Sequence, residues 1–120
     1  MRPWVRFIVF GLAVPLASAQ AVQPVLTTAE AAKHVGENRT VCGDIVNEHT
    51  ASSAHGAPLF IDIDQPYPNQ IFDLVIWGDN KDDVGKIPEK GKVCASGQII
   101  LYKGRPEILL RDWHSWYVPQ

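Results

Sequence analysis

The chain has 120 residues, of which 46% are hydrophobic and 20% are charged, and its formal net charge is −2. This is ordinary globular composition with room for one domain, and there are no internal repeats of solenoid length and no low-complexity run. Because the net charge is negative, overall charge does not attract a polyanion such as nucleic acid. A binding site for a polyanion would therefore have to be a local basic patch.

The first nineteen residues are typical of a secretory signal peptide. Arg2 and Arg6 form a short basic start, 7–16 is apolar, and Ala17-Ser18-Ala19 supplies the small residues that a signal peptidase needs. The alternative is a membrane anchor, but the apolar run is shorter than the roughly 20 residues that span a bilayer. We therefore expect cleavage after Ala19 and a periplasmic or secreted protein without a stable membrane anchor. The mature chain then carries nine basic against thirteen acidic residues, a net charge of −4.

Residues 20–38 are expected to form a leader and a short helix ahead of a domain covering 39–120. Thr27 and Glu30 fit a capping box that begins the helix, and Gly36 marks its end. Its narrow apolar face comprises Ala29, Ala32 and Val35, with Ala31 beside them. His34 is expected on the surface, near the C-terminal end of this helix.

Hydrophobic alternation predicts three strands, over 39–48, 58–64 and 70–77, followed by a short helix over 80–85. Gly43, in the middle of the first strand, indicates a sharp bend of the kind that a small barrel requires. The segment 47–56 is polar and small and is predicted to be a loop.

Alternate residues of the second and third strands are expected to face opposite sides of the sheet. The side chains expected to face inward are Leu59, Ile61, Ile63, Phe72, Leu74 and Ile76. The side chains expected to face outward are Phe60, Asp62, Asp64, Ile71, Asp73, Val75 and Trp77.

The last part of the domain predicts a β-hairpin. Apolar runs over 93–102 and 108–110 flank Lys103-Gly104-Arg105-Pro106, whose glycine and proline allow the chain to reverse direction. Pro106 has no N–H, so it fits the start of a strand or an edge. The first arm begins with Val-Cys, as the stretch from Val41 does, and we expect these two strands to be partners in one sheet.

Cys42 and Cys94 are the two cysteines of the chain. An exported protein meets an oxidising compartment, so we expect a structural disulfide between them. A redox motif or a metal site is the weaker alternative, because there is no C-x-x-C and the two cysteines lie far apart in the sequence.

Five strands, with one short helical connection between the third and the fourth, predict a mainly β fold that forms a small closed or nearly closed barrel. Three stretches, 41–45, 93–99 and 102–108, carry a resemblance that covers 41–118. They resemble the OB-fold, and in particular small bacterial exported OB domains akin to the nucleic-acid-binding, anticodon-domain-like branch. In that fold the first strand pairs with the fourth, which would bring Cys42 and Cys94 together.

The resemblance implies a ligand groove across the second and third strands. The segment 49–55 would form one wall of this groove and the last hairpin the other. The expected ligand-binding residues are Phe60, Tyr67, Asp73, Trp77, Tyr102, Lys103 and Arg105, with Asp62 and Val75 on the same face.

Single-stranded nucleic acid requires aromatic faces for stacking and cations along the backbone. The groove residues supply both, and Arg111 adds a cation. Asp62, Asp64 and Asp73 would repel phosphates from the same face, so the nucleic-acid prediction rests on the fold analogy more than on charge. The alternative for each aromatic side chain is packing under loops or against the N-terminal helix.

We expect no metal, no cofactor and no catalytic residue. Asp62, Asp64 and Asp73 have the oxygen ligands for Ca²⁺, and Glu48, His49 and His55 are possible transition-metal ligands, but solvated carboxylates and loop histidines more often bind nothing. Both cysteines are expected to be oxidised and no serine lies in a nucleophile motif, so the protein is expected not to be an enzyme.

The C-terminal stretch Trp113-His114-Ser115-Trp116-Tyr117 places three aromatic side chains in five residues. It either packs on the barrel or exposes a patch for a partner. The sequence therefore favours an exported binding protein for nucleic acid or an oligonucleotide. The alternative is an adaptor or ligand-binding module for an envelope protein, a saccharide or another envelope component.

Overall fold

The computed structural model describes residues 3–4, 11–13, 22–53 and 55–120, so most of the predicted signal peptide, including its cleavage site, lies outside the described residues. The strands are β1 (Leu26–Thr27), β2 (Asn38–Thr50), β3 (Leu59–Ile63), β4 (Asp73–Ile76), β5 (Gly91–Tyr102), β6 (Arg105–Leu109) and β7 (Trp116–Tyr117). The helical pieces are α1 (Thr28–Ala31), η1 (Gly78–Asn80), α2 (Lys81–Val84) and η2 (Trp113–Ser115). In this part of the chain, no helix is long and apolar enough to span a membrane.

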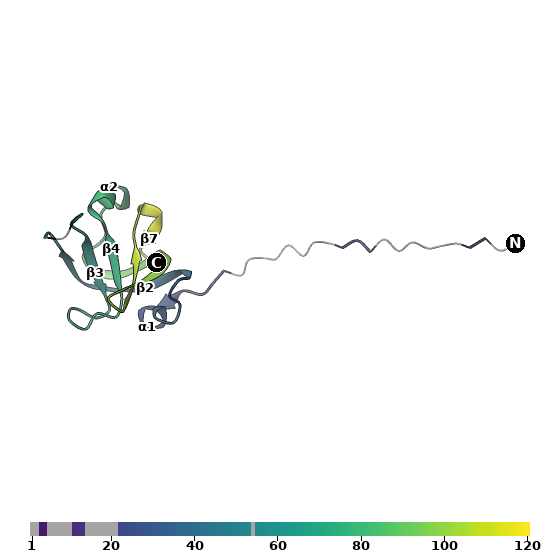
Figure 1. Cartoon of the computed structure of the whole chain (residues 1–120), viewed down its shortest axis with the longest axis horizontal. Coiled ribbons are helices and arrows are strands. Elements are labelled where there is room, and N and C mark those ends of the chain that lie inside the picture. The colour runs from purple at the N-terminus through teal and green to yellow at the C-terminus, as the bar shows by residue number, and fades with distance from the viewer. Residues whose placement is uncertain (1–2, 5–10, 14–21, 54) are drawn as a thin grey trace.

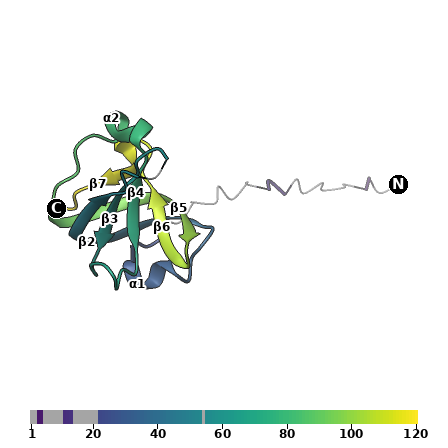
Figure 2. The same ribbon diagram turned by 60° about the vertical axis from the view of Figure 1, so that its left-hand side comes forward.

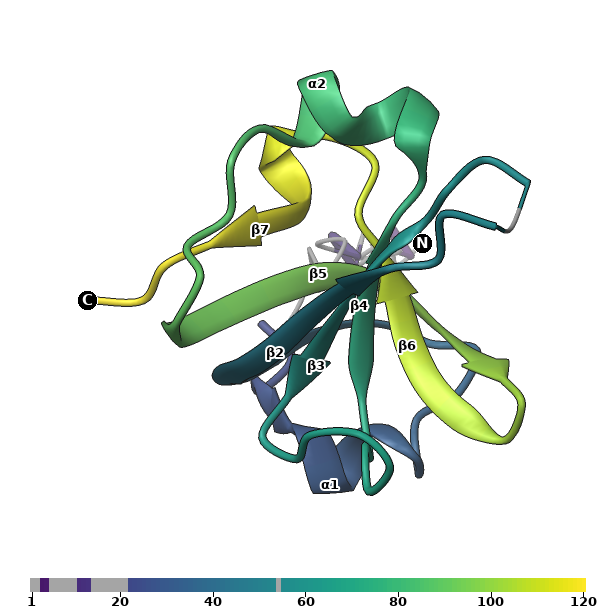
Figure 3. The ribbon, with the colours of Figure 1, turned by 90° about the vertical axis from the view of Figure 1, so that its left-hand side faces the viewer.

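Five of the strands close into a barrel. The sheet order is β1-β2-β3-β4-β6-β5-β7, and β2 also pairs with β5, which joins the two ends of the series β2, β3, β4, β6 and β5 (Figure 3). Within this ring β4 and β6 run parallel, and the other neighbours are antiparallel. The predicted mainly β fold with a closed five-stranded barrel is confirmed, and the strand order is consistent with an OB-like barrel.

The long strand β2 makes closure possible because it bends. A Cβ atom on Gly43 would lie 2.8 Å from the carboxylate of Asp64 and against a methyl group of Ile63, so only glycine fits where β3 crosses so closely. The register then shifts between Ile45 and Asn47. Residues before the shift pair with β5, and residues after it pair with β3.

The prediction of a loop over 47–56 is wrong in its first half. The strand β2 continues to Thr50, and His49 lies opposite Phe60. The segment stays in a strand despite its polar side chains because its backbone pairs with β3. The composition of the segment does not reveal this pairing. The third strand is also shorter than expected, since β4 covers only Asp73–Ile76.

The interior of the barrel holds the apolar side chains expected to face inward. Ile61, Ile63, Phe72, Leu74 and Ile76 are all buried in one hydrophobic cluster. Leu59 packs against the cluster but is only partly buried. The helical pieces α1 and α2 lie at opposite ends of the barrel (Figure 1), and α2 covers its end with the buried Val84.

The predicted N-terminal capping box is present, with the Thr27 hydroxyl accepting from the N–H of Glu30. The helix itself ends after Ala31 and does not reach Gly36, so its buried residues are Thr28 and Ala31 and the predicted face of Ala29, Ala32 and Val35 is exposed. The predicted face requires two or more helical turns, and α1 has only four residues. The leader is anchored to the barrel, because Leu26 is buried and pairs with Val41 of β2.

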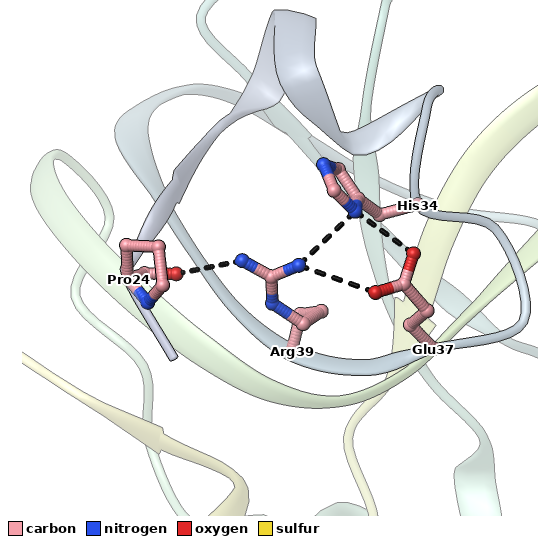
Figure 4. A network of polar contacts seen from close by, with 4 residues as sticks. All are labelled: Pro24, His34, Glu37 and Arg39. Carbon is pink, nitrogen blue, oxygen red and sulfur yellow. Dashed lines mark hydrogen bonds and ion pairs between the residues drawn. The ribbon is translucent and has the colours of Figure 1, made fainter. Parts of the chain in front are cut away.

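A buried arginine holds this N-terminal segment against β2 (Figure 4). Arg39 donates to the carbonyl oxygen of Pro24 at 3.0 Å and to the carboxylate of Glu37 at 3.2 Å. Its guanidinium also lies 3.0 Å from Nδ1 of His34. His34 is therefore half-buried in a polar network and is not the surface residue that the sequence suggested.

The predicted disulfide is present. Cys42 and Cys94 lie directly opposite each other on the antiparallel strands β2 and β5, and their sulfur atoms are bonded. The predicted hairpin is present as well, with Lys103 and Gly104 at positive φ in the turn between β5 and β6. Pro106 occupies the second position of β6, near the start of the strand as expected.

We expect reduction of the disulfide to lower the free energy of unfolding by about 4 kcal/mol, because the bond closes a loop with a sequence separation of 52 residues. Denaturant titrations of the oxidised protein and of Cys42→Ser/Cys94→Ser measure the difference. Thiol titration under denaturing conditions is the independent check, and two reactive thiols in the protein purified without reductant would contradict the assignment.

Candidate functional site

A groove of about 480 Å³ lies on the outer face of the barrel over β3, β4 and β6, which run side by side (Figure 2). Six of the seven side chains predicted to bind a ligand line it: Phe60, Tyr67, Trp77, Tyr102, Lys103 and Arg105. The seventh, Asp73, lies beneath the groove and is hydrogen-bonded to Arg105. The closed barrel therefore brings residues from three separate stretches of the chain to one surface.

Aromatic rings form much of the groove wall. His49 stacks on Phe60 with ring centroids 5.2 Å apart, and the ring of Tyr102 lies 6.4 Å from that of Phe60. Tyr67 is 74% exposed, and Trp77 and Tyr102 are each less than half exposed. These rings offer partly solvated faces to a planar ligand.

Trp77 stands between this groove and a smaller hollow of about 300 Å³. Its ring is held by the loop between β2 and β3, where a Cβ on Gly56 would come within 3.0 Å of the ring. His55 and Arg111 line the smaller hollow and not the main groove. Of the wall predicted over 49–55, therefore, His49 and Ala51 line the main groove.

A row of three acidic side chains forms the floor under the groove. Asp62 of β3 lies opposite Asp73 of β4, and Asp73 is in register with Glu107 of β6. Both aspartates are fully buried and Glu107 is 4% exposed. The prediction that Asp62 and Asp73 are solvated is wrong: they face outward from the barrel, but the groove side chains and loops cover them. Val75, on the same face, is buried for the same reason.

The two aspartates are accommodated by neighbours that donate hydrogen bonds. Arg105 Nε lies 2.6 Å from Oδ2 of Asp73, and Nδ2 of Asn47 lies 3.3 Å from Oδ2 of Asp62. His49 Nδ1 is 4.0 Å from the same oxygen of Asp62. The remaining oxygen of each aspartate, Oδ1, is buried without a donor in the described part of the chain.

The electrostatics of Asp73 favour its neutral form. Burial foremost, and then a hydrogen bond to Asp62, raise the pKa of Asp73 to about 7, against the positive charge of Arg105. The carboxyl of Asp73 is therefore neutral below about pH 7, which lowers the electrostatic cost of burying it beside Asp62.

Glu107 is the groove residue that sequence reasoning missed, along with Gln70 and Pro58. It lies two positions after Arg105 on β6, so both side chains point to the same face. That spacing was a usable signal for Glu107, whereas the positions of Gln70 and Pro58 depend on how the loops fold. Burial raises the pKa of Glu107, against the attraction of Arg105.

Asp64 does not join the acidic floor. Its carboxylate accepts hydrogen bonds from the Thr28 hydroxyl and, at 2.8 Å, from the backbone N–H of Asp44. It therefore ties α1 to the bend of β2. Across the described residues, no group of three or more histidine, cysteine, aspartate or glutamate side chains has the arrangement of a metal site.

The C-terminal stretch is partly packed and partly exposed. The strand β7 pairs with β5, and the indole N–H of Trp116 donates to the carbonyl oxygen of Val84 at 2.9 Å. Trp113 is 64% exposed, and Tyr117 is about half exposed. Trp116 therefore packs on the barrel, whereas Trp113 and Tyr117 remain exposed.

A search of protein-family models gives no match to this chain, and a search of curated proteins gives none either.

We expect the free energy of unfolding to fall by about 2 kcal/mol as the pH rises from about 5 to about 7.5. The pKa of Asp73 is about 7 in the folded protein, against 3.8 without the fold, so the folded state holds the proton more tightly and loses that advantage as the proton leaves. Urea titrations at the two pH values measure the change. Asp73→Asn should make the decrease shallower, and Asp82→Asn, an exposed site on α2, should not. An unchanged decrease in Asp73→Asn would refute the assignment.

Proposed function

We propose that this is an exported, non-catalytic binding protein whose groove takes a short single strand of nucleic acid. The observation that carries the proposal is the gathering of partly exposed aromatic rings and two basic side chains on one groove. Stacking on aromatic faces, with cations along the backbone, is how proteins hold single strands without reading their sequence.

The basic side chains lie at the hairpin end of the groove. Lys103 Nζ lies 5.4 Å from the centre of the Tyr102 ring, so a cation and an aromatic face occur together. Arg105 has a side chain that is 25% exposed and lines the same groove. A phosphate beside a base stacked on Tyr102 would be within reach of this end.

The acidic residues are a weaker objection than the sequence suggested. Asp62 and Asp73 are buried, burial raises the pKa of Asp73 to about 7, and Arg105 donates to the carboxyl of Asp73. Asp64 is engaged with Thr28 and Asp44, away from the groove. The repulsion that these residues exert on phosphates is therefore smaller than that of three solvated carboxylates.

Export is part of the proposal. The disulfide between Cys42 and Cys94 is typical of proteins in oxidising compartments, and the N-terminal sequence is typical of a signal peptide. We infer a periplasmic or secreted location for the mature chain from Gln20 onward.

A second candidate function is an adaptor for an envelope protein or a saccharide. The specific observation in its favour is the exposure of Trp113, Tyr117 and Val118, which lie within six residues of the sequence and do not line the groove. Binding of such a partner should tolerate salt and depend on Trp113. Binding of nucleic acid in the groove should weaken with salt and should not depend on Trp113.

We expect the mature protein to bind a fluorescently labelled single-stranded DNA weakly at about 50 mM salt and to lose affinity steeply by about 200 mM, because phosphate contacts release counterions. Tyr67→Ala should weaken binding by about tenfold, the effect of one lost stacking partner. Tyr67 is largely exposed, so this change should not unfold the protein. Fluorescence anisotropy measures both effects.

Two matched controls accompany this test. Trp113→Ala removes an exposed aromatic ring outside the groove, and Lys86→Gln removes an exposed cation outside it, so neither should alter the affinity. Lys103→Gln, inside the groove, should weaken binding and flatten its dependence on salt. No binding at the lower salt concentration would retire the nucleic-acid function, and loss of partner binding in Trp113→Ala would favour the adaptor.

A further inference from the structure

We propose that the smaller hollow beside Trp77 is a second phosphate subsite, in which Arg111 holds the part of a nucleic-acid strand that extends beyond the main groove. This inference rests on the nucleic-acid function proposed above, and it adds the path and the length of the strand that the protein takes.

Trp77 connects the two hollows. Its side chain is 42% exposed and lines both the main groove of about 480 Å³ and the smaller hollow of about 300 Å³. The boundary between the two hollows is held by backbone contacts. The N–H of Gly78 donates to the carbonyl oxygen of Gly56 at 3.0 Å, and a Cβ on Gly78 would lie 2.7 Å from that oxygen. The hollows are therefore neighbours that share one aromatic side chain.

The parallel pairing of β4 with β6 brings Arg111 to the same place (Figure 3). Val75 is in register with Leu109, and the N–H of Leu110 donates to the carbonyl oxygen of Val75 at 2.9 Å. Two residues after Val75 and Leu109 come Trp77 and Arg111, and both line the smaller hollow. The register thus places a cation beside the aromatic ring that the two hollows share.

Arg111 is accessible to a ligand. The residue is exposed, and among the described residues its guanidinium forms neither a hydrogen bond nor an ion pair. A guanidinium donates through five N–H groups and pairs closely with phosphate oxygens. Of the other charged side chains that line the hollow, Asp79 opposes an anion, and His55 is a cation only when protonated.

The spacing of two arginines sets the length of strand that the protein can hold. Arg105 and Arg111 are 111 − 105 = 6 residues apart, and the alternate residues Pro106, Ile108 and Leu110 are buried, so both arginines belong to the outer face. At about 3.3 Å per residue their backbones are about 20 Å apart. A stacked strand advances about 3.4 Å per nucleotide, so about six steps between phosphates cover this distance. The seven internucleotide phosphates of an octamer reach both arginines, and the three of a tetramer do not.

The test measures binding of fluorescein-labelled thymidine tetramers and octamers by anisotropy at about 50 mM salt. We expect Arg111→Gln to weaken octamer binding by about fivefold and to flatten its logarithmic salt dependence by about 0.7, the value for one phosphate contact on a single strand. Tetramer affinity should change by less than about twofold, because the tetramer stays in the main groove. Lys103→Gln should weaken binding of both probes.

Lys86→Gln is the matched control, because it removes an exposed cation that lines neither hollow and should leave both affinities unchanged. Asp79→Asn tests the hollow independently of Arg111. It removes the carboxylate that opposes a phosphate there and should tighten octamer binding by about twofold. Asp82→Asn, an exposed site on α2 outside both hollows, should not tighten it.

The outcomes separate the two proposals. If Arg111→Gln weakens neither probe, or weakens both equally, the second subsite is wrong and the nucleic-acid function still stands. If Arg111→Gln weakens octamer binding and Lys103→Gln does not, the strand does not run through both hollows and the proposed path is wrong. Failure of the wild-type protein to bind the octamer would overturn the nucleic-acid function itself, and the second subsite with it.

Discussion

The bend of β2 at Gly43 is the constraint on which the rest of the structure depends. One strand has to pair with β5 in its first half and with β3 in its second half for the barrel to close. Close approach of Ile63 and Asp64 leaves no room for a side chain at the bend. The disulfide at Cys42, one residue earlier, ties the same part of β2 to β5. The closure of the barrel, the bend at Gly43 and the disulfide therefore all depend on the same part of β2.

Closure has a direct consequence for the groove. The parallel pairing of β4 with β6 places Asp73 beside Glu107, and the hairpin that precedes β6 brings Tyr102 and Lys103 to the same surface. Residues 60, 77 and 105 become neighbours because β6 is inserted between β4 and β5 and not added at an edge. An open sheet of the same strands would not form this groove.

The groove combines apolar walls with a floor of opposite charges. Burial favours the neutral forms of Asp73 and Glu107, while Arg105 favours their charged forms. Asp73 accepts from Arg105 and does not line the groove, whereas Glu107 lines it and has an oxygen, Oε2, with no donor in the part of the chain that the structure describes. Such an unequal distribution of partners is what gives a binding surface chemical selectivity, since a ligand gains most where the protein is least satisfied.

Local sequence signals determined the elements that depend on neighbours in the chain. Alternating apolar residues located the five strands of the barrel and most of the core, the capping box located the start of α1, and Lys103-Gly104 located the last turn, whereas the short strands β1 and β7 were not predicted. The wrong predictions concern contacts across the fold. Polar residues after Ile45 remained in a strand because β3 pairs with them, and the helix ended at Ala31 although its pattern continued.

The residues of the candidate site also fall into those that the sequence predicted and those that depend on contacts across the fold. The sequence, through the resemblance of its strands to an OB-fold, identified six of the residues that line the groove, and it also identified the two cysteines that cross-link β2 and β5. It misjudged Asp62 and Asp73 and overlooked Glu107, because burial is a property of what lies above a side chain and not of the strand that carries it. Periodicity reports which face of a strand a residue occupies. Only the tertiary structure decided whether that face meets water, a proton or a neighbouring charge, since those partners come from strands distant in the sequence.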